Sequence, residues 1–275
     1  MKVDLMRKVD FYIGVPLCFL FSILFKILFI FRRKGNIQPK NILFIELSEM
    51  GSAILVDPAM KKLQRSLANS ELFFVIFKRN KPSLNLLNTI KEENIFTIQE
   101  DSFLSLTFDT LRFLMWSRMQ KIDTVIDLEL FSRFTALLTI LSGADNRVGF
   151  YGYHNEGLYR GDFLTHKVAY NPHIHIAKNF ISLINALLSN NREVPYSKTL
   201  ITDEEIRLDK VTIDQKQKIQ MIEKIETLCQ LFNRDKKRIV LINPNASEML
   251  IQRRWMPENF SLLIQYVLKD RKSVV

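Results

Sequence analysis

The sequence predicts an α/β protein with a parallel, doubly wound sheet, preceded by an apolar helix that associates with a membrane. Two observations indicate the sheet. Short runs of aliphatic and aromatic residues alternate with longer amphipathic segments, and polar turns separate the two kinds of segment. Strands that alternate with helices pair in parallel, because each crossover helix returns the chain to the end of the sheet at which the previous strand began. The third observation is a long apolar run near the N-terminus with basic residues on both sides.

Composition limits the class of protein. The chain has 275 residues, 47% hydrophobic and 25% charged, which allows one large domain or two modest ones. Its two cysteines, Cys18 and Cys229, form no disulfide framework, as expected in a reducing compartment. Residues 1–40 hold eight Lys or Arg against two Asp, so they contribute +6 of the net charge of +10. This excess flanks the apolar run, which favours a membrane over a nucleic acid as the anionic partner.

The apolar run is residues 11–31, in which only Ser22 and Lys26 are clearly polar. Fifteen Leu, Ile, Val and Phe side chains outweigh the roughly 3 kcal/mol that one lysine costs near the middle of a bilayer. The basic residues 32–34 follow it, which places the next domain on the cytoplasmic face of the inner membrane. A helix buried in a soluble core is the alternative, and a signal peptide is disfavoured because no small-residue cleavage site follows.

Two features of this run argue against a simple membrane span. Pro16 suits the start of a helix, and a helix from there to residue 31 is shorter than the roughly 20 residues that a span needs. In addition, small or polar residues recur at every fourth position, giving one stripe along the helix: Gly14, Cys18, Ser22 and Lys26. This stripe either packs on the protein or faces lipid headgroups.

After a linker that ends at residue 40, residues 41–200 are predicted to form a Rossmann-like domain. The expected strands are 41–47, 72–77, 95–98, 124–128 and 147–150, and the expected helices are 53–67, 82–90, 102–120, 132–141 and 174–188. Pro58 marks a kink or a second helix start, and Gly143 closes a helix. The irregular stretch 151–172 is a candidate functional loop. Residues 201–236, with an amphipathic helix at 214–232, are expected to bridge to a second domain.

Residues 237–275 are predicted to open that second domain. Ile239 to Ile242 form an expected strand, a turn follows at Asn243-Pro244-Asn245, and a polar loop leads to a helix opened by Pro257-Glu258. The loop contains Ser247 and the basic pair Arg253-Arg254. Two cations before the free N–H groups of a helix start are suited to an anion. The alternative is an ordinary connection with two solvated arginines.

Three motifs carry a resemblance to a known family. They are N-P-N-A-S followed by the basic pair and Trp, the segment ELSEMGSAILVDPAM at 46–60, and the segment 126–150 ending in Arg-Val-Gly-Phe. Together and in this order they resemble glycosyltransferase family 9, the family of the lipopolysaccharide heptosyltransferases. The resemblance implies a GT-B fold of two facing Rossmann-like domains. It also implies inverting transfer of a sugar from a nucleotide diphosphate to a membrane-linked glycan, with no metal or other cofactor.

The resemblance suggests catalytic residues in the loop after the first strand. The family's carboxylate, its expected base, falls on Ser52, and a serine without a partner base is a poor proton acceptor at neutral pH. Glu49 in the same loop is the expected substitute, or else a solvated loop acid. For the donor, the resemblance places Arg253 and Arg254 beside the diphosphate, with Ser247 and Asn243 reaching a phosphate or the nucleoside.

Acceptor-binding residues are expected at the carboxyl ends of the strands, where open α/β sheets bind ligands. That rule selects 46–52, 127–133 and the stretch from Arg147 onward. Asp127 or Glu129 is expected to hold a ligand hydroxyl. Arg133 and Arg147 either meet an acceptor phosphate or make structural ion pairs. His173 and His175 lack an accompanying carboxylate cluster, so no metal site is predicted.

The expected second domain is short. The chain ends soon after Phe260, and residues 273–275 resemble the start of its next strand. We therefore expect a truncated product whose 275 residues are inactive on their own. A different class of function is a non-catalytic membrane-surface protein that retains the fold, and a third is a soluble nucleotide-binding module.

Overall fold

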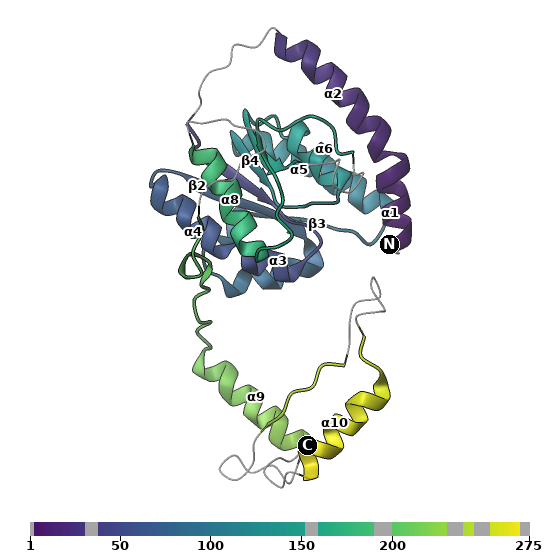
Figure 1. Cartoon of the computed structure of the whole chain (residues 1–275), viewed down its shortest axis with the longest axis vertical. Helices are drawn as coiled ribbons and strands as arrows, with labels where there is room; N and C mark the ends of the chain where they lie inside the picture. Colours follow the sequence, from purple (N-terminus) through teal and green to yellow (C-terminus); the bar gives the residue numbers. More distant parts are fainter. Residues whose placement is uncertain are drawn as a thin grey trace. The chain divides into compact units, whose positions relative to one another are not determined.

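The computed structural model describes residues 3–30, 38–151, 159–189, 200–229, 239–244 and 254–269. The chain divides into two compact units, Met1–Lys210 and Val211–Val275 (Figure 1). The boundary between them falls within the segment that the sequence assigns to a bridge. The N-terminal helices belong to the first unit rather than standing apart from it.

The first unit contains a six-stranded, all-parallel sheet in the order β3-β2-β1-β4-β5-β6. The strands are β1 (Asn41–Ile45), β2 (Glu71–Phe77), β3 (Ile95–Ile98), β4 (Thr124–Asp127), β5 (Asn146–Phe150) and β6 (His166–Val168). All five predicted strands are confirmed. The sixth, β6, lies in the stretch predicted to be irregular, because three residues of which two are basic or imidazole-bearing give no apolar strand pattern.

The helices of the sheet domain also follow the predicted alternation. They are α3 (Met50–Leu55), α4 (Asp57–Ser66), α5 (Phe103–Met119), α6 (Arg133–Leu141) and α8 (Ile176–Leu188), with short 3₁₀ helices η1 (Lys78–Leu86), η2 (Glu92–Asn94) and η3 (Glu204–Ile206). Pro58 stands in the first turn of α4, so the predicted second helix start is confirmed. The helix expected at 82–90 is instead a 3₁₀ helix that begins directly after β2.

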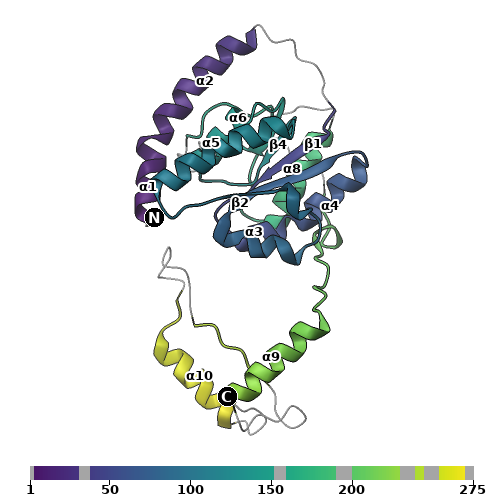
Figure 2. The same ribbon diagram turned by 180° about the vertical axis from the view of Figure 1, so that it is seen from behind.

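Helices cover both faces of the sheet, which explains why its strands are almost continuously apolar. Along β1, Ile42 and Phe44 point into the core shared with α3, α4 and α8. The alternate residues Leu43 and Ile45 point into the core shared with α5 and α6. Figures 1 and 2 show the second pair of helices on the same side of the sheet as the N-terminal helices.

The N-terminal apolar run forms α2 (Gly14–Ile30), which follows the unpredicted helix α1 (Val3–Tyr12). Hydrogen bonds from Ile13 to Val9 and from Leu17 to Ile13 carry the helical pattern across the break. The stretch Leu5–Ile27 is long and apolar enough to cross a membrane by length and composition. One side of α2 nevertheless packs against α6, with Cys18 fully buried in that contact.

In the second unit the described elements are α9 (Gln215–Leu228) and α10 (Pro257–Lys269), so both predicted helices are confirmed. The predicted strand at 239–242 is wrong, because these residues are described and take no strand conformation. Ile239, Val240 and Leu241 are exposed there. A single strand cannot pair its own backbone groups. The described parts of this unit offer it no neighbouring strand.

Candidate active site

Glu49 and Ser52, the predicted catalytic residues, lie next to one another after β1. Glu49 is the N-cap residue of α3 and its side chain is exposed, whereas Ser52 is buried in the first turn. The Ser52 hydroxyl donates a hydrogen bond to Glu49 Oε2 at 3.0 Å. The serine therefore orients the Glu49 carboxylate through Oε2. The other carboxylate oxygen, Oε1, makes no contact with Ser52. This arrangement suits a base whose proton acceptor is Glu49 rather than Ser52.

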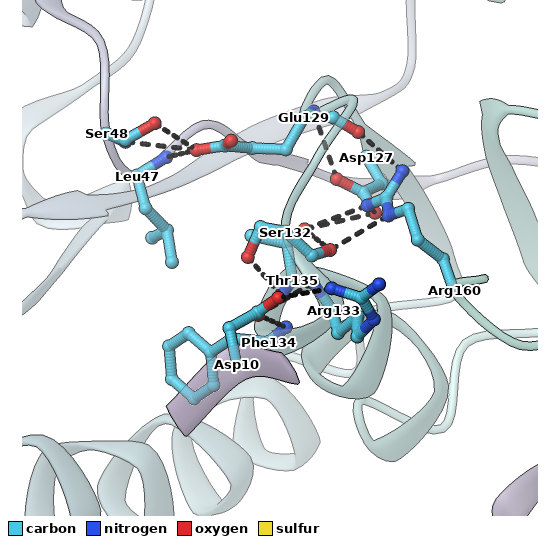
Figure 3. A network of polar contacts seen from close by, with 10 residues as sticks. All are labelled: Asp10, Leu47, Ser48, Asp127, Glu129, Ser132, Arg133, Phe134, Thr135 and Arg160. Atoms are coloured by element: carbon cyan, nitrogen blue, oxygen red, sulfur yellow. Dashed lines mark hydrogen bonds and ion pairs between the residues drawn. The ribbon is translucent and has the colours of Figure 1, made fainter. Parts of the chain in front are cut away.

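Two acids, Glu46 after β1 and Glu129 after β4, connect the loops that follow these strands. Glu46 is buried, and its Oε1 accepts from the Glu49 amide at 3.2 Å. Burial raises the pKa of Glu46 well above its usual range, and the nearby Glu129 carboxylate raises it further. Glu129 Oε1 accepts from the Ser48 hydroxyl at 2.7 Å and from the Ser48 amide at 3.1 Å (Figure 3). Burial therefore disfavours the charged form of Glu46 in this pair of acids.

Asp127 is buried at the end of β4 and pairs with Arg160, a residue that sequence reasoning missed. Arg160 Nη2 donates to Asp127 Oδ2 at 2.5 Å, and its other nitrogens donate to the carbonyls of Glu129 and Ser132 (Figure 3). Burial raises the pKa of Asp127 to about 6, although the Arg160 charge acts in the opposite direction. The guanidinium therefore fixes the loop between β4 and α6. Asp127 serves that loop in this structure, and its predicted contact with a ligand hydroxyl remains a prediction.

Arg133 makes a structural ion pair, one of the two alternatives that the sequence left open. Its guanidinium Nη1 donates to Asp10 Oδ2 at 3.0 Å and its Nε donates to the Tyr159 carbonyl at 2.9 Å. Asp10 Oδ1 also accepts from the backbone amides of Arg133 and Phe134 at 2.8 and 3.0 Å (Figure 3). A carboxylate from α1 therefore caps α6 from outside, at the helix end that favours negative charge.

Arg147 lies toward the amino end of its strand. It is the second residue of β5, paired in register with Val125 near the amino end of β4, whereas the site forms at the carboxyl ends. Its Nε donates to the Phe163 carbonyl at 2.6 Å, and its Nη1 donates to the Ala144 carbonyl at 2.5 Å. The Arg147 guanidinium is therefore bonded to backbone carbonyls of the same unit, and its predicted contact with an acceptor phosphate remains a prediction.

The predicted donor residues lie in the second unit. Asn243 and Arg254 are described and exposed, and Arg254 stands three positions before α10. Ser247 and Arg253 lie outside the described residues. The four donor assignments therefore remain predictions.

The histidines near α8 have a local structural role. His175 is the N-cap of α8, and its Nδ1 accepts from the Ala177 amide at 3.2 Å. Within the described ranges, His, Cys, Asp and Glu side chains form no group of three or more that could hold a metal ion.

Comparison with known proteins relies on structure alone. No protein-family model matches the sequence, and no curated protein matches it. The E. coli ADP-heptose LPS heptosyltransferase II is similar at a TM-score of 0.58 and 14% identity, over 85% of this chain and 62% of that one. A glycosyl transferase family 9 protein from Veillonella parvula DSM 2008 is similar at a TM-score of 0.57 and 17% identity, over 85% of this chain and 60% of that one.

These similarities establish the fold. The chain has the α/β fold of GT-B-type glycosyltransferases and spans about three fifths of the length of the two solved structures. At 14% and 17% identity they do not transfer a substrate to this chain.

Proposed function

We propose that the chain is a family 9 glycosyltransferase whose sheet domain binds the sugar acceptor. Its reaction is the inverting, metal-independent transfer of a heptose-like sugar from a nucleotide diphosphate to a lipopolysaccharide or another membrane-linked glycan. The fold and the three ordered sequence motifs support this proposal. The observation that carries it is the exposed Glu49 carboxylate at the carboxyl edge of β1, held by the serine that stands where the family motif has its acid.

In this mechanism Glu49 acts as the general base. It takes the proton from an acceptor hydroxyl while the hydroxyl oxygen attacks the anomeric carbon of the donor sugar. The bond from that carbon to the diphosphate breaks, and the diphosphate leaves with its electron pair from the opposite face. Arg253 and Arg254 stabilise the leaving charge in this proposal, with Asn243 and Ser247 contacting the nucleotide.

The buried acids Glu46 and Asp127 have supporting roles in this proposal. Burial raises the pKa of Glu46 and so disfavours a second negative charge behind Glu49. Glu46 Oε1 accepts a hydrogen bond from the Glu49 amide at 3.2 Å, which fixes the backbone of the proposed base. Asp127 and Arg160 hold the adjoining loop in place, so acceptor selectivity depends on their geometry without requiring direct contact with the sugar.

Attachment to a membrane completes the proposal. In this proposal the protein lies on the cytoplasmic face of the inner membrane, where a lipid-linked acceptor is within reach. The apolar surface of α1 and α2 and the basic residues that follow support this location. Recovery of the protein in the supernatant without detergent would contradict this location.

The test combines binding and transfer, because binding of the acceptor can be measured independently of the chemical step. The detergent-solubilised chain should bind a lipopolysaccharide acceptor of short glycan length, and Glu49→Gln should leave that affinity within about threefold. If the chain transfers sugar, Glu49→Gln should lower kcat by roughly 10²- to 10⁴-fold. Equal transfer rates for the wild type and Glu49→Gln would eliminate Glu49 as the base.

One observation favours the alternative of a non-catalytic membrane-surface protein. Ser52 occupies the family's acid position, and both predicted acceptor arginines are engaged in structural contacts. Such a protein would bind membranes equally well with and without the glycan. Glycan-dependent binding distinguishes the two functions.

A further inference from the structure

The first unit carries an apolar surface that neither the sheet nor the proposed active site uses. On α5 one face packs inward through Leu106, Phe113 and Trp116. The opposite face presents five large apolar side chains that are each more than half exposed: Leu104, Phe108, Leu111, Met115 and Met119. Their spacing of three or four residues places them in one row along the helix.

This row lies on the same side of the sheet as the N-terminal helices. Both α1 and α5 contact α6, and Met6 of α1 packs into the core that α5 closes. Figures 1 and 2 show α1, α2, α5 and α6 gathered on this side of the sheet, while α3 and α4 cover the other. The outer faces of α1 and α2 are also apolar and exposed: Leu5, Phe11, Tyr12, Ile13, Phe19, Leu20, Ile23, Leu24 and Ile27.

The polar contacts of the N-terminal helices extend from residue 10 to residue 26. Asp10 is bound by Arg133, Ser22 accepts from the Asp162 amide at 3.0 Å, and Lys26 lies 3.5 Å from the Asp162 carboxylate. Asp10 and Lys26 are 16 positions apart, which is about 24 Å along a helix. The hydrocarbon core of a bilayer is about 30 Å thick, so a span with these contacts intact would carry the folded domain into the lipid. A membrane-bound helix that keeps these contacts therefore lies in the membrane plane.

Within residues 5–27 and 103–119 the exposed charged side chains are all basic. The only acids within residues 5–27 and 103–119 are Asp10 and Asp109, and each is bound to an arginine, Arg133 and Arg112 respectively. The exposed cations include Arg7, Lys8 and Arg118. An apolar row bordered by cations, with its acids neutralised, is complementary to an anionic lipid surface.

We infer that α5 is a second membrane-contacting element, which together with α1 and α2 docks the first unit on anionic lipid as a monotopic protein. This inference rests on the proposed membrane attachment but not on glycosyl transfer. With α1, α2 and α5 in contact with lipid, the domain is held at two separated places. Its orientation on the bilayer is then fixed, whereas a single helix would allow rotation about its own axis.

Vesicle binding by the full chain tests the inference. The variant Leu111→Glu/Met115→Glu should bind vesicles of phosphatidylcholine with phosphatidylglycerol at least tenfold more weakly than the wild type. The matched control is Leu86→Glu/Leu200→Glu, which alters two exposed leucines away from α1, α2 and α5 and should bind as the wild type does. Wild-type affinity of the α5 variant would overturn the inference.

A second readout separates the role of α5 from membrane attachment itself. In a Cys229→Ser background, a polarity-sensitive fluorophore is placed on Met115→Cys or on Leu20→Cys. Both labels should shift to the blue on adding the vesicles. A shift at position 20 alone would leave attachment intact and refute the role of α5, and a shift at neither would refute attachment as well. Concentration-dependent self-association that the α5 variant abolishes, without vesicle binding, would assign the surface to a second copy of the chain.

Discussion

Asp10 is predicted to hold the N-terminal helices on the sheet domain, and Asp10→Ala tests that contact. The substitution removes three acceptor contacts at once: the Arg133 guanidinium at 3.0 Å and the amides of Arg133 and Phe134 at 2.8 and 3.0 Å. The Arg133 side chain is only 6% exposed, whereas that of Asp10 is 20% exposed. Arg133 keeps its bond to the Tyr159 carbonyl.

The magnitude follows from these contacts. Removing one partner of a buried ion pair costs about 3 to 5 kcal/mol, and the partial exposure of Asp10 places this pair at about 3 kcal/mol. Asp10→Asn keeps an oxygen acceptor for the two amides, so it should retain about 1 kcal/mol of that stability. Lys8→Ala, on the exposed side of the same helix, is the control and should change the free energy of unfolding by less than about 0.5 kcal/mol.

The assay is denaturant unfolding followed by the fluorescence of Trp116, which packs against Phe73, Phe96 and Phe113 within the first unit. A Trp255→Phe background removes the tryptophan of the second unit. An Asp10→Ala midpoint indistinguishable from that of Lys8→Ala would refute the contribution of the cap and ion pair to stability.

Three further predictions concern the interior of the first unit. Because the pKa of buried Asp127 is about 6 against an ordinary 3.8, the folded state binds the extra proton, and stability relative to Asp127→Asn should fall by roughly 3 kcal/mol as the pH rises from about 4 to about 6. Urea titrations at several pH values measure this, and parallel profiles would contradict it. Arg160→Ala leaves Asp127 without its charge partner and should cost about 3 kcal/mol at pH 7, when compared with Arg112→Ala on the exposed side of α5. Gly14→Ala places a Cβ 2.8 Å from Arg133 Cβ and should destabilise by about 1 to 3 kcal/mol, whereas Gly51→Ala, which meets no atom within 4 Å, should not destabilise through a clash.

The strand and helix alternation of the sheet domain was predictable because both faces of the sheet are buried. Strands such as β1 and β2 are almost continuously apolar, and helix starts carry side chains such as Ser102 and Ser132 that cap the first turn. β6 was not predictable in this way, because it pairs only with β5 at the sheet edge and needs few apolar residues. The strand expected at 239–242 was wrong for a different reason. These residues have the apolar pattern of a strand, but the described part of the second unit contains no strand with which they could pair.

The candidate site was predicted in part. The proximity of Glu49 and Ser52 follows from one short loop, so sequence spacing was sufficient to find it. Arg160 comes from a distant stretch, and only the fold brings it to Asp127. The one available signal was indirect: a buried acid at a strand end needs a cation or a proton. The role of Asp10 depends on how α1 packs on α6, which no local pattern specifies.

The most direct test of the proposed function is glycan-dependent binding at the edge that carries Glu49. The full chain is titrated with lipid nanodiscs that contain a short-glycan lipopolysaccharide, and with nanodiscs of the same lipids without the glycan. The proposed function predicts at least tenfold tighter binding to the glycan-bearing discs, an advantage of about 1.4 kcal/mol that Glu49→Arg should remove. Equal affinity for both kinds of disc would contradict an acceptor site and would favour a protein that binds only the membrane surface.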